Sequence, residues 1–308
     1  MAGVRSFDIA GVKLGGELGE NPTLLVGSVF YHGDKLLANE EEGVFSREKA
    51  RRVIEDAASL ADRYGLRFGL DVIFPSPRSV DRIMPFVSEL DLPLFLDSPS
   101  RDARIKAYSM AKELGLANRC VANGIGVTTD EEELRAIRES GIRAAVLLAF
   151  DPRNPAASMR PEARLEIVRG ALLPKAEKAG VDKPLLDAIV LDPASIAISA
   201  EAVRLFRTEL GLPSGCAPAN ALGPVSKKAF SPEEVISIHS AVAVMLRVFG
   251  TDFILYGPVK RIKHLAPAVA MVDGLLGYLA KQRGARVGRG HPMRTLLRRV
   301  QQLFAQGP

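Results

Sequence analysis

The sequence predicts an α/β protein of the (β/α)8 TIM-barrel class, in which eight parallel strands close into a barrel surrounded by helices. Short apolar runs alternate with longer amphipathic segments, and eight such pairs fill about 260 of the 308 residues. An open dinucleotide-binding sheet would carry the pattern G-x-G-x-x-G after an early strand, whereas Gly124 and Gly126 lack the third glycine. The closed barrel is therefore the preferred architecture.

Apolar runs bounded by turn residues are typical of buried parallel strands. Eight strands are expected, at residues 23–30, 67–73, 93–96, 119–122, 144–149, 188–191, 212–216 and 252–256. Helical spacing predicts helices between them, at residues 47–64, 79–90, 102–114, 161–179, 195–210 and 267–283. Two further helices are expected to begin after Thr129 and Ser231, because each is followed by the acidic first turn that suits a helix start.

Segments outside these repeats extend the barrel at both ends. Residues 7–9 and 12–14 are expected to form a hairpin that plugs the bottom of the barrel, within a barrel domain of residues 1–284. Residues 285–308 form a basic C-terminal extension, in which 295–304 has apolar residues at helical spacing and is expected to dock as a short helix.

Composition limits the class of protein. No stretch reaches the roughly 20 apolar residues that cross a bilayer, and the first residues lack the apolar core of a signal peptide. Two cysteines make no disulfide framework, so we expect a cytoplasmic protein. Seven of the Lys and Arg residues lie from Lys281 onward, which leaves 34 basic and 36 acidic residues in the rest of the chain. Nucleic-acid binding by the body is not expected.

Polar side chains follow six consecutive expected strands. In order, these are Asp71, Asp97 with Ser98, Asn123, Asp151, Asp192 and Asn220. Active sites of such barrels form at this C-terminal end of the strands, so the six positions are expected to share one mouth. Each alone has a simpler interpretation, because Asp and Asn after a strand commonly cap a helix or form a turn.

The expected mouth lacks the residues that several common reaction types require. No Lys for a Schiff base, no Ser-His-Asp arrangement and no H-E-x-x-H metal motif occurs at these positions, and no metal site is expected. His32, in the loop after the first strand, is a candidate to reach the mouth. Carboxylates and carboxamides without a strong cation suit a flat ring with an edge of N–H donors, such as a pterin.

The residues around these strand ends resemble a known family. The similarity covers residues 9–16, 19–23, 27–31, 93–98, 144–150, 191–196, 211–216 with Asn220, 252–258 and 267–273. In these segments the chain resembles the MtrH subunit of the tetrahydromethanopterin S-methyltransferase complex and its bacterial relatives that use tetrahydrofolate. The resemblance implies a pterin-binding barrel of the dihydropteroate synthase-like type.

The resemblance also implies roles for the strand-end residues. Pterin binding is assigned to Asp71, Asp97, Ser98, Asn123, Asp151 and Asp192. Asn220 is expected beside the methyl-bearing nitrogen, and Asn220 and Asp192 are the expected catalytic residues.

The implied reaction moves a methyl group between N5 of tetrahydromethanopterin or tetrahydrofolate and the cobalt of a corrinoid. The corrinoid would be carried by a partner protein, since this chain has no D-x-H-x-x-G motif of its own. A homodimer is expected, because barrels of this group often dimerise.

Two other functions stay open at this point. The first is a barrel aldolase or lyase acting on a phosphorylated substrate, which would need a lysine or a phosphate-binding glycine loop after the last two strands. The second is a non-catalytic scaffold for a corrinoid protein, in which residues 285–308 would carry the function.

Overall fold

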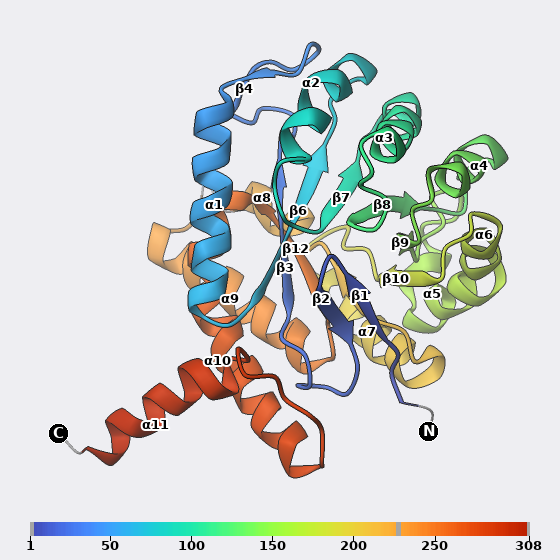
Figure 1. The fold of residues 1–308 in the computed structure, drawn as a ribbon. Helices are drawn as coiled ribbons and strands as arrows, with labels where there is room; N and C mark the ends of the chain where they lie inside the picture. Colours follow the sequence, from blue (N-terminus) through green and yellow to red (C-terminus); the bar gives the residue numbers. More distant parts are fainter. Residues whose placement is uncertain (1–2, 226–228, 307–308) are drawn as a thin grey trace.

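A computed structural model describes residues 3–225 and 229–306 and confirms the closed barrel (Figure 1). Eight parallel strands pair in the closed order β10-β11-β12-β3-β6-β7-β8-β9. Their bounds are β3 (Leu24–Val29), β6 (Arg67–Ile73), β7 (Leu94–Asp97), β8 (Cys120–Ile125), β9 (Ala144–Leu148), β10 (Lys183–Asp187), β11 (Ser214–Cys216) and β12 (Phe253–Pro258). Because all eight run the same way, their C-terminal ends meet at one end of the barrel.

Helices surround the strands (Figure 1). They are α1 (Arg47–Arg63), α2 (Pro77–Val87), α3 (Arg101–Glu113), α4 (Glu131–Ser140), α5 (Pro161–Ile167), α6 (Leu173–Lys178), α7 (Ser195–Leu210), α8 (Ala219–Val225), α9 (Pro232–Val248), α10 (Ile262–Gln282) and α11 (Arg298–Ala305). The helix expected at residues 161–179 is divided by a π-helical turn, Val168–Leu172. The helix expected from 267 begins at Ile262 and contains Pro267 inside it.

Side-chain caps explain where several helices begin. Ser46 accepts a hydrogen bond from the backbone N–H of Lys49, and Ser231 forms a reciprocal capping box with Glu234. The cap of α4 is Asp130, which accepts from the N–H of Glu133 at 2.9 Å, and not the predicted Thr129. The prediction was wrong by one residue because an Asp carboxylate is also a strong cap.

The sixth strand lies earlier in the sequence than predicted. β10 spans Lys183–Asp187, where it pairs with Ala144–Leu148 of β9, and the expected strand at 188–191 is instead a loop before α7. The apolar run continues past Asp187, so hydrophobicity alone does not mark the end of the strand. This correction changes which aspartate stands at the mouth of the barrel.

The predicted N-terminal hairpin is confirmed. β1 (Ser6–Ile9) and β2 (Val12–Gly15) pair antiparallel, with Phe7 opposite Leu14. Ile9 and Leu14 are fully buried against side chains inside the barrel, among them Leu24 and Phe95. The hairpin therefore covers the N-terminal end of the barrel with apolar side chains, as expected.

A buried ion network joins the first barrel strand to the last helices. Arg247 on α9 contacts Asp273 on α10 at 2.6 Å, and the other oxygen of Asp273 accepts from the N–H of Thr23 at 2.8 Å. Arg207 on α7 contacts Asp252 at 2.5 Å, and Asp252 also accepts from the N–H of Ser214 at 3.0 Å. All four charged side chains are buried, so each carboxylate offsets the desolvation of its arginine.

The C-terminal extension docks through a shorter segment than predicted. Met293 and Leu297 pack with Val287 against Met271 of α10. The following helix α11 has no buried residue and projects from the body, so the docking expected for residues 295–304 is confirmed for Leu296 and Leu297 and wrong for the rest (Figure 1). In the described part of the chain, no helix combines the length and apolarity needed to cross a membrane.

Removing one partner of the buried network should be costly. We expect Asp273→Ala to lower the free energy of unfolding by about 3–5 kcal/mol, because the buried Arg247 would keep only the more distant Asp252, at 3.8 Å, and the N–H of Thr23 would lose its acceptor. Asp182→Ala is the matched control, since Asp182 pairs with Arg143 at the surface, where such pairs contribute about 0–1 kcal/mol. Urea denaturation of both variants measures the difference, and equal small losses would contradict this account.

Candidate functional site

A cavity of about 300 Å³ lies inside the C-terminal end of the barrel. Its polar lining comes from strand ends and from the loop after β11, and consists of Ser28, Asp71, Asp97, Asn123, Asp187 and Asn220. Apolar side chains, including Leu148 and Leu255, complete the walls. This is the mouth predicted from the sequence, with three carboxyl groups gathered in a small space.

Asp71 lies deepest and is held by two hydrogen bonds. The hydroxyl of Ser28 donates to one carboxylate oxygen at 2.7 Å, and the Asn123 amide donates to the other at 3.2 Å. Strand pairing places Asp71 opposite Phe95, so Asp97 stands two residues nearer the opening. Burial raises the pKa of Asp71, and the hydrogen bonds from Ser28 and Asn123 oppose this rise.

Asp97 lies beside Asn123 in the strand register, at the end of β7. Burial is the main cause that raises its pKa, and repulsion from the neighbouring Asp71 raises it further. The Arg104 guanidinium acts in the opposite direction. Without a ligand, two neighbouring carboxyl groups therefore resist carrying charge together.

Asp187 ends β10 and is held in place by its own loop. Its carboxylate accepts from the N–H of Ile189 at 2.7 Å, and Ile189 has left-handed backbone with φ 48°. Burial raises the pKa of Asp187 to about 6, against the backbone bond and the charge of Arg164.

Arg164 fixes this loop from the side of α5. Its fully buried guanidinium donates to the carbonyls of Ala188 and Ile189, to the hydroxyl of Ser199 at 3.0 Å and to the carbonyl of Ser158 at 2.8 Å. The described residues include no carboxylate within ion-pairing distance of this arginine. Arg164 therefore acts on the site by positioning the backbone next to Asp187.

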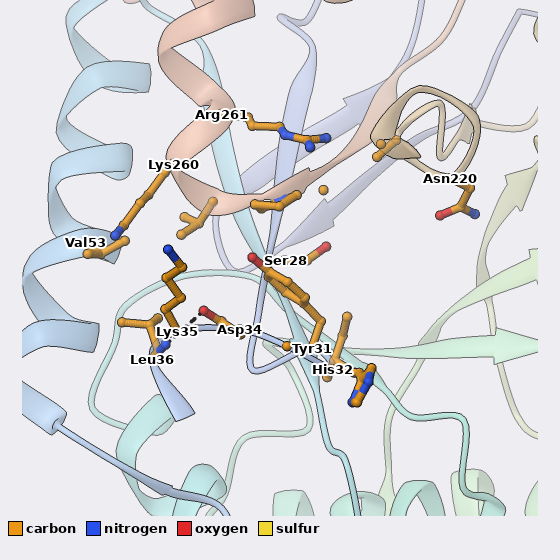
Figure 2. A pocket seen from close by; sticks show the side chains of 17 residues that line it. Ser28, Tyr31, His32, Asp34, Lys35, Leu36, Val53, Asn220, Lys260 and Arg261 are labelled. Carbon is orange, nitrogen blue, oxygen red and sulfur yellow. Dashed lines mark hydrogen bonds between the residues drawn. The ribbon is translucent and has the colours of Figure 1, made fainter. Parts of the chain in front are cut away.

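Asn220 stands at the opening of the cavity, near the start of α8 (Figure 2). It is exposed, its backbone N–H donates to the carbonyl of Ala217, and its side-chain amide forms no hydrogen bond with a described residue. Its amide can thus both donate to and accept from a ligand in the cavity.

A second, wider cavity of about 710 Å³ opens beside the first. Ser28, Ile73, Ala219, Asn220 and Gly257 line both cavities, so the two adjoin at these residues. The loop after β3 and the turn before α10 supply charged and polar groups to the outer part, which are Tyr31, His32, Asp34, Lys35, Lys260 and Arg261 (Figure 2).

Four of the predicted site residues therefore come together, namely Asp71, Asp97, Asn123 and Asn220. Three do not line the cavity. Asp192 is exposed, and its carboxylate accepts from the N–H of Ser195, the first residue of α7, at 2.7 Å, because β10 ends four residues earlier than predicted. Its expected place in the mouth is wrong.

The other two hold loops in place. Asp151 forms an ion pair with Arg153 at 2.8 Å outside the deep cavity. Ser98 is buried and donates its hydroxyl to the carbonyl of Phe74 at 2.6 Å. Both positions follow strands, but their side chains satisfy local backbone or charge, which is the simpler role open to such residues. His32 lines the outer cavity and contacts Glu40 at 2.7 Å.

Asp187 is the site residue that sequence reasoning missed. A signal for it exists, because Pro184 to Asp187 repeats the pattern of Pro93 to Asp97, an apolar run that ends in Asp. Aligning these two runs would have placed the sixth strand correctly.

The lining of the deep cavity suits a ligand that donates hydrogen bonds. Carboxylates accept only, whereas Asn123 and Asn220 offer both donors and acceptors. No lysine or histidine lines this deep cavity among the described residues, and none of their His, Cys, Asp and Glu side chains form a group suited to a metal ion. The site can orient a flat polar ring and stabilise charge on it.

Comparisons with known proteins agree with this geometry. A family model described as the tetrahydromethanopterin S-methyltransferase MtrH subunit matches residues 4–287, which leaves most of the C-terminal extension outside the match. The same subunit of the tetrahydromethanopterin S-methyltransferase of Methanocaldococcus jannaschii is 32% identical over 312 residues, covering 94% of this chain and 97% of its own. That of Methanothermobacter thermautotrophicus is 31% identical over 304 residues, with coverages of 94% and 97%.

Solved structures share the fold. Dihydropteroate synthase of Vibrio fischeri aligns with a TM-score of 0.61 at 13% identity, covering 88% of this chain and 98% of its own. The Yersinia pestis enzyme with a pterine-sulfa conjugate aligns with a TM-score of 0.60 at 15% identity, with coverages of 88% and 99%. At this identity the likeness shows a common barrel fold.

The buried Asp187 predicts a pH dependence of stability. A folded-state pKa of about 6, above the unfolded value of 3.8, means that stability is lost as pH rises between these two values. Asp187→Asn keeps an acceptor for the Ile189 N–H and removes the titration. We expect it to gain about 2–3 kcal/mol over the parent above pH 6, and nothing at pH 3.5.

Thermal unfolding followed by circular dichroism across this pH range measures the gain. Asp192→Asn is the matched control, because it also removes one charge from this loop while its amide oxygen can still accept from the N–H of Ser195. A gain that does not change with pH would show that Asp187 is not the group responsible.

Proposed function

The chain belongs to the family of the MtrH subunit of tetrahydromethanopterin S-methyltransferase, and from this membership we propose that it is a methyltransferase acting on a methylated tetrahydropterin. The methyl group would move between N5 of the pterin and the cobalt of a corrinoid that a partner protein carries. The observation that carries the proposal is the gathering of Asp71, Asp97, Asn123, Asp187 and Asn220 around one cavity.

The deep cavity fits the ring of a tetrahydropterin. The 2-amino and N3–H groups form a donor pair, and a carboxylate accepts such a pair with two parallel hydrogen bonds. Asp97 and Asp187 line the cavity and are candidates for this role, while Asp71 is already held by Ser28 and Asn123. The ring donors would also stabilise the ionised carboxylate, which burial disfavours in the empty cavity.

The chemical difficulty of this reaction is the leaving group. Cobalt(I) supplies the nucleophile, so the N5–methyl bond breaks as a cobalt–methyl bond forms with both electrons from cobalt. The pair that remains on N5 must be stabilised by a proton or a strong hydrogen bond. Asn220 is suited to this task, because its amide is at the opening and bonds to no described side chain.

The acceptor would reach N5 from the open end of the barrel, since the β1–β2 hairpin covers the other end. Relatives carry the name of a subunit of a methyltransferase, which supports a protein partner for this chain. We propose a corrinoid protein as that partner. A homodimer and a cytoplasmic location remain part of the same proposal.

The aldolase or lyase alternative is less well supported. Schiff-base chemistry needs a lysine at the reacting carbon, and the lysines of this region, Lys35 and Lys260, line the outer cavity. A scaffold without catalysis would not need buried carboxyl groups with raised pKa values around a small cavity.

The proposal is tested by titrating the protein with N5-methyltetrahydrofolate and N5-methyltetrahydromethanopterin, and by mixing each with cob(I)alamin. We expect one of them to bind and its methyl group to appear on cobalt, observed as the change from the cob(I)alamin to the methylcobalamin spectrum. If neither compound binds and no methyl moves, the proposed function is wrong.

Replacing Asn220 should affect the rate more than the binding. We expect Asn220→Ala to lower kcat about 100-fold, because it removes a hydrogen bond that strengthens as charge develops on N5, with a small change in the Kd of the methylated pterin. Asn118→Ala, an exposed residue before β8 at the other end of the barrel, is the control and should retain the parent rate. An equal fall in both variants, or a large rise in Kd alone, would remove Asn220 from the catalytic step.

A further inference from the structure

The outer cavity carries an excess of positive charge that the proposed transfer reaction does not use. Lys35 comes from the loop after β3, and Lys260 and Arg261 come from the turn between β12 and α10. Among the residues whose side chains the structure describes, no carboxylate lies within ion-pairing distance of any of these three cations. Figure 2 shows Arg261 extending from the start of α10 toward the side of Asn220.

Asp34 is the acidic residue that lines this cavity, and the backbone already occupies both of its oxygens. One accepts from the N–H of Phe30 at 2.8 Å, and the other accepts from the N–H of Leu36 at 3.0 Å (Figure 2). Glu40, next to the cavity, is engaged by His32 at 2.7 Å. Neither carboxylate forms an ion pair with the three cations, and among the described lining residues the three positive charges exceed the single negative charge of Asp34.

Arg261 is partly buried, so an anionic partner for its guanidinium group is expected. Burial lowers its pKa, and the nearest ionisable group that opposes this effect is the phenol of Tyr31. The pKa of Tyr31 is itself raised, mainly by burial, so its hydroxyl stays neutral and is available as a hydrogen-bond donor. Partly buried guanidinium groups are usually paired with a carboxylate or phosphate, and no described carboxylate pairs with Arg261.

We propose that the outer cavity binds the anionic tail of the methylated tetrahydropterin, through Lys35, Lys260, Arg261 and the Tyr31 hydroxyl. This inference rests on the proposed function, because it assigns the ring to the deep cavity. The two cavities adjoin at Ser28 and Asn220, which line both, so a single ligand can place a neutral ring among the carboxyl groups and its negatively charged end among the cations. The outer cavity would then select ligands by the charge of the tail, and the deep cavity would select them by the shape of the ring.

The test compares two ligands that share the ring and differ in the tail. N5-methyltetrahydrofolate ends in two carboxylates, and an N5-methylated tetrahydropterin with a methyl group in place of the tail has none. Calorimetric titration gives the Kd of each. We expect Arg261→Gln to raise the Kd of the folate about tenfold and Lys260→Gln about threefold, because charge-assisted hydrogen bonds are lost at a partly buried and an exposed position.

Neither substitution should change the Kd of the tailless ligand more than about twofold, since the carboxylates that bind the ring are untouched. Lys281→Gln is the matched control, because it removes one exposed positive charge at the far end of the same helix, α10. Raising the salt concentration gives a second measurement on the parent protein, and it should weaken binding of the folate more than binding of the tailless ligand.

The outcomes separate this inference from the proposed function. If the parent protein binds neither ligand, and does not bind N5-methyltetrahydromethanopterin, the proposed function fails. If both ligands bind and the cavity substitutions change neither Kd, or change both equally, the proposed function stands and the tail does not occupy the outer cavity. Repeating the series with N5-methyltetrahydromethanopterin distinguishes a tail that carries phosphate from one that ends in carboxylates alone.

Discussion

An eight-stranded barrel exists only if its first and last strands pair, and in this protein buried ion pairs anchor the residues that immediately precede the paired strands β3 and β12. Asp273 binds Arg247 and also the backbone N–H of Thr23, which immediately precedes β3. Asp252 immediately precedes β12, binds Arg207 and accepts from Ser214. The network thus ties the beginning of the barrel to helices that come more than 180 residues later in the chain. Since the carboxyl groups of the mouth lie on strands whose register depends on closure, the site depends on this network.

The two ends of the barrel use carboxylates in opposite ways. At the N-terminal end each buried Asp has a buried Arg, and its charge is balanced. At the C-terminal end Asp71, Asp97 and Asp187 form no ion pair with a described arginine, and burial raises their pKa values. The Asp–Arg pairs stabilise the fold. The unpaired aspartates of the mouth lower the stability of the fold and leave hydrogen-bond acceptors for a ligand. The contrast separates structural aspartates from those of the site on physical grounds.

Much of the fold could be predicted from the sequence, because apolar runs and helical spacing report burial directly. The barrel, the N-terminal hairpin and the positions of Asp71, Asp97, Asn123 and Asn220 follow from this. The sixth strand was misplaced, because apolar residues lie on both sides of Asp187 and hydrophobicity alone does not mark which run is the strand, whereas the pairing with β9 does. The outer cavity was missed for another reason: Lys35 and Arg261 lie on loops at opposite ends of the sequence, and no local pattern joins them.

The hairpin that covers the N-terminal end of the barrel affects the order in which reactants can bind and leave. With that end filled by Ile9 and Leu14, a small molecule that settles among the deep carboxyl groups enters from the open end. A protein-borne acceptor would have to approach the same opening and would lie over the small molecule. Under the proposed function, the methylated pterin would therefore bind before the protein that carries the acceptor. The demethylated pterin would leave only after that protein has dissociated. A compulsory order of binding would thus depend on two four-residue strands, β1 and β2, at the opposite end of the barrel from the site.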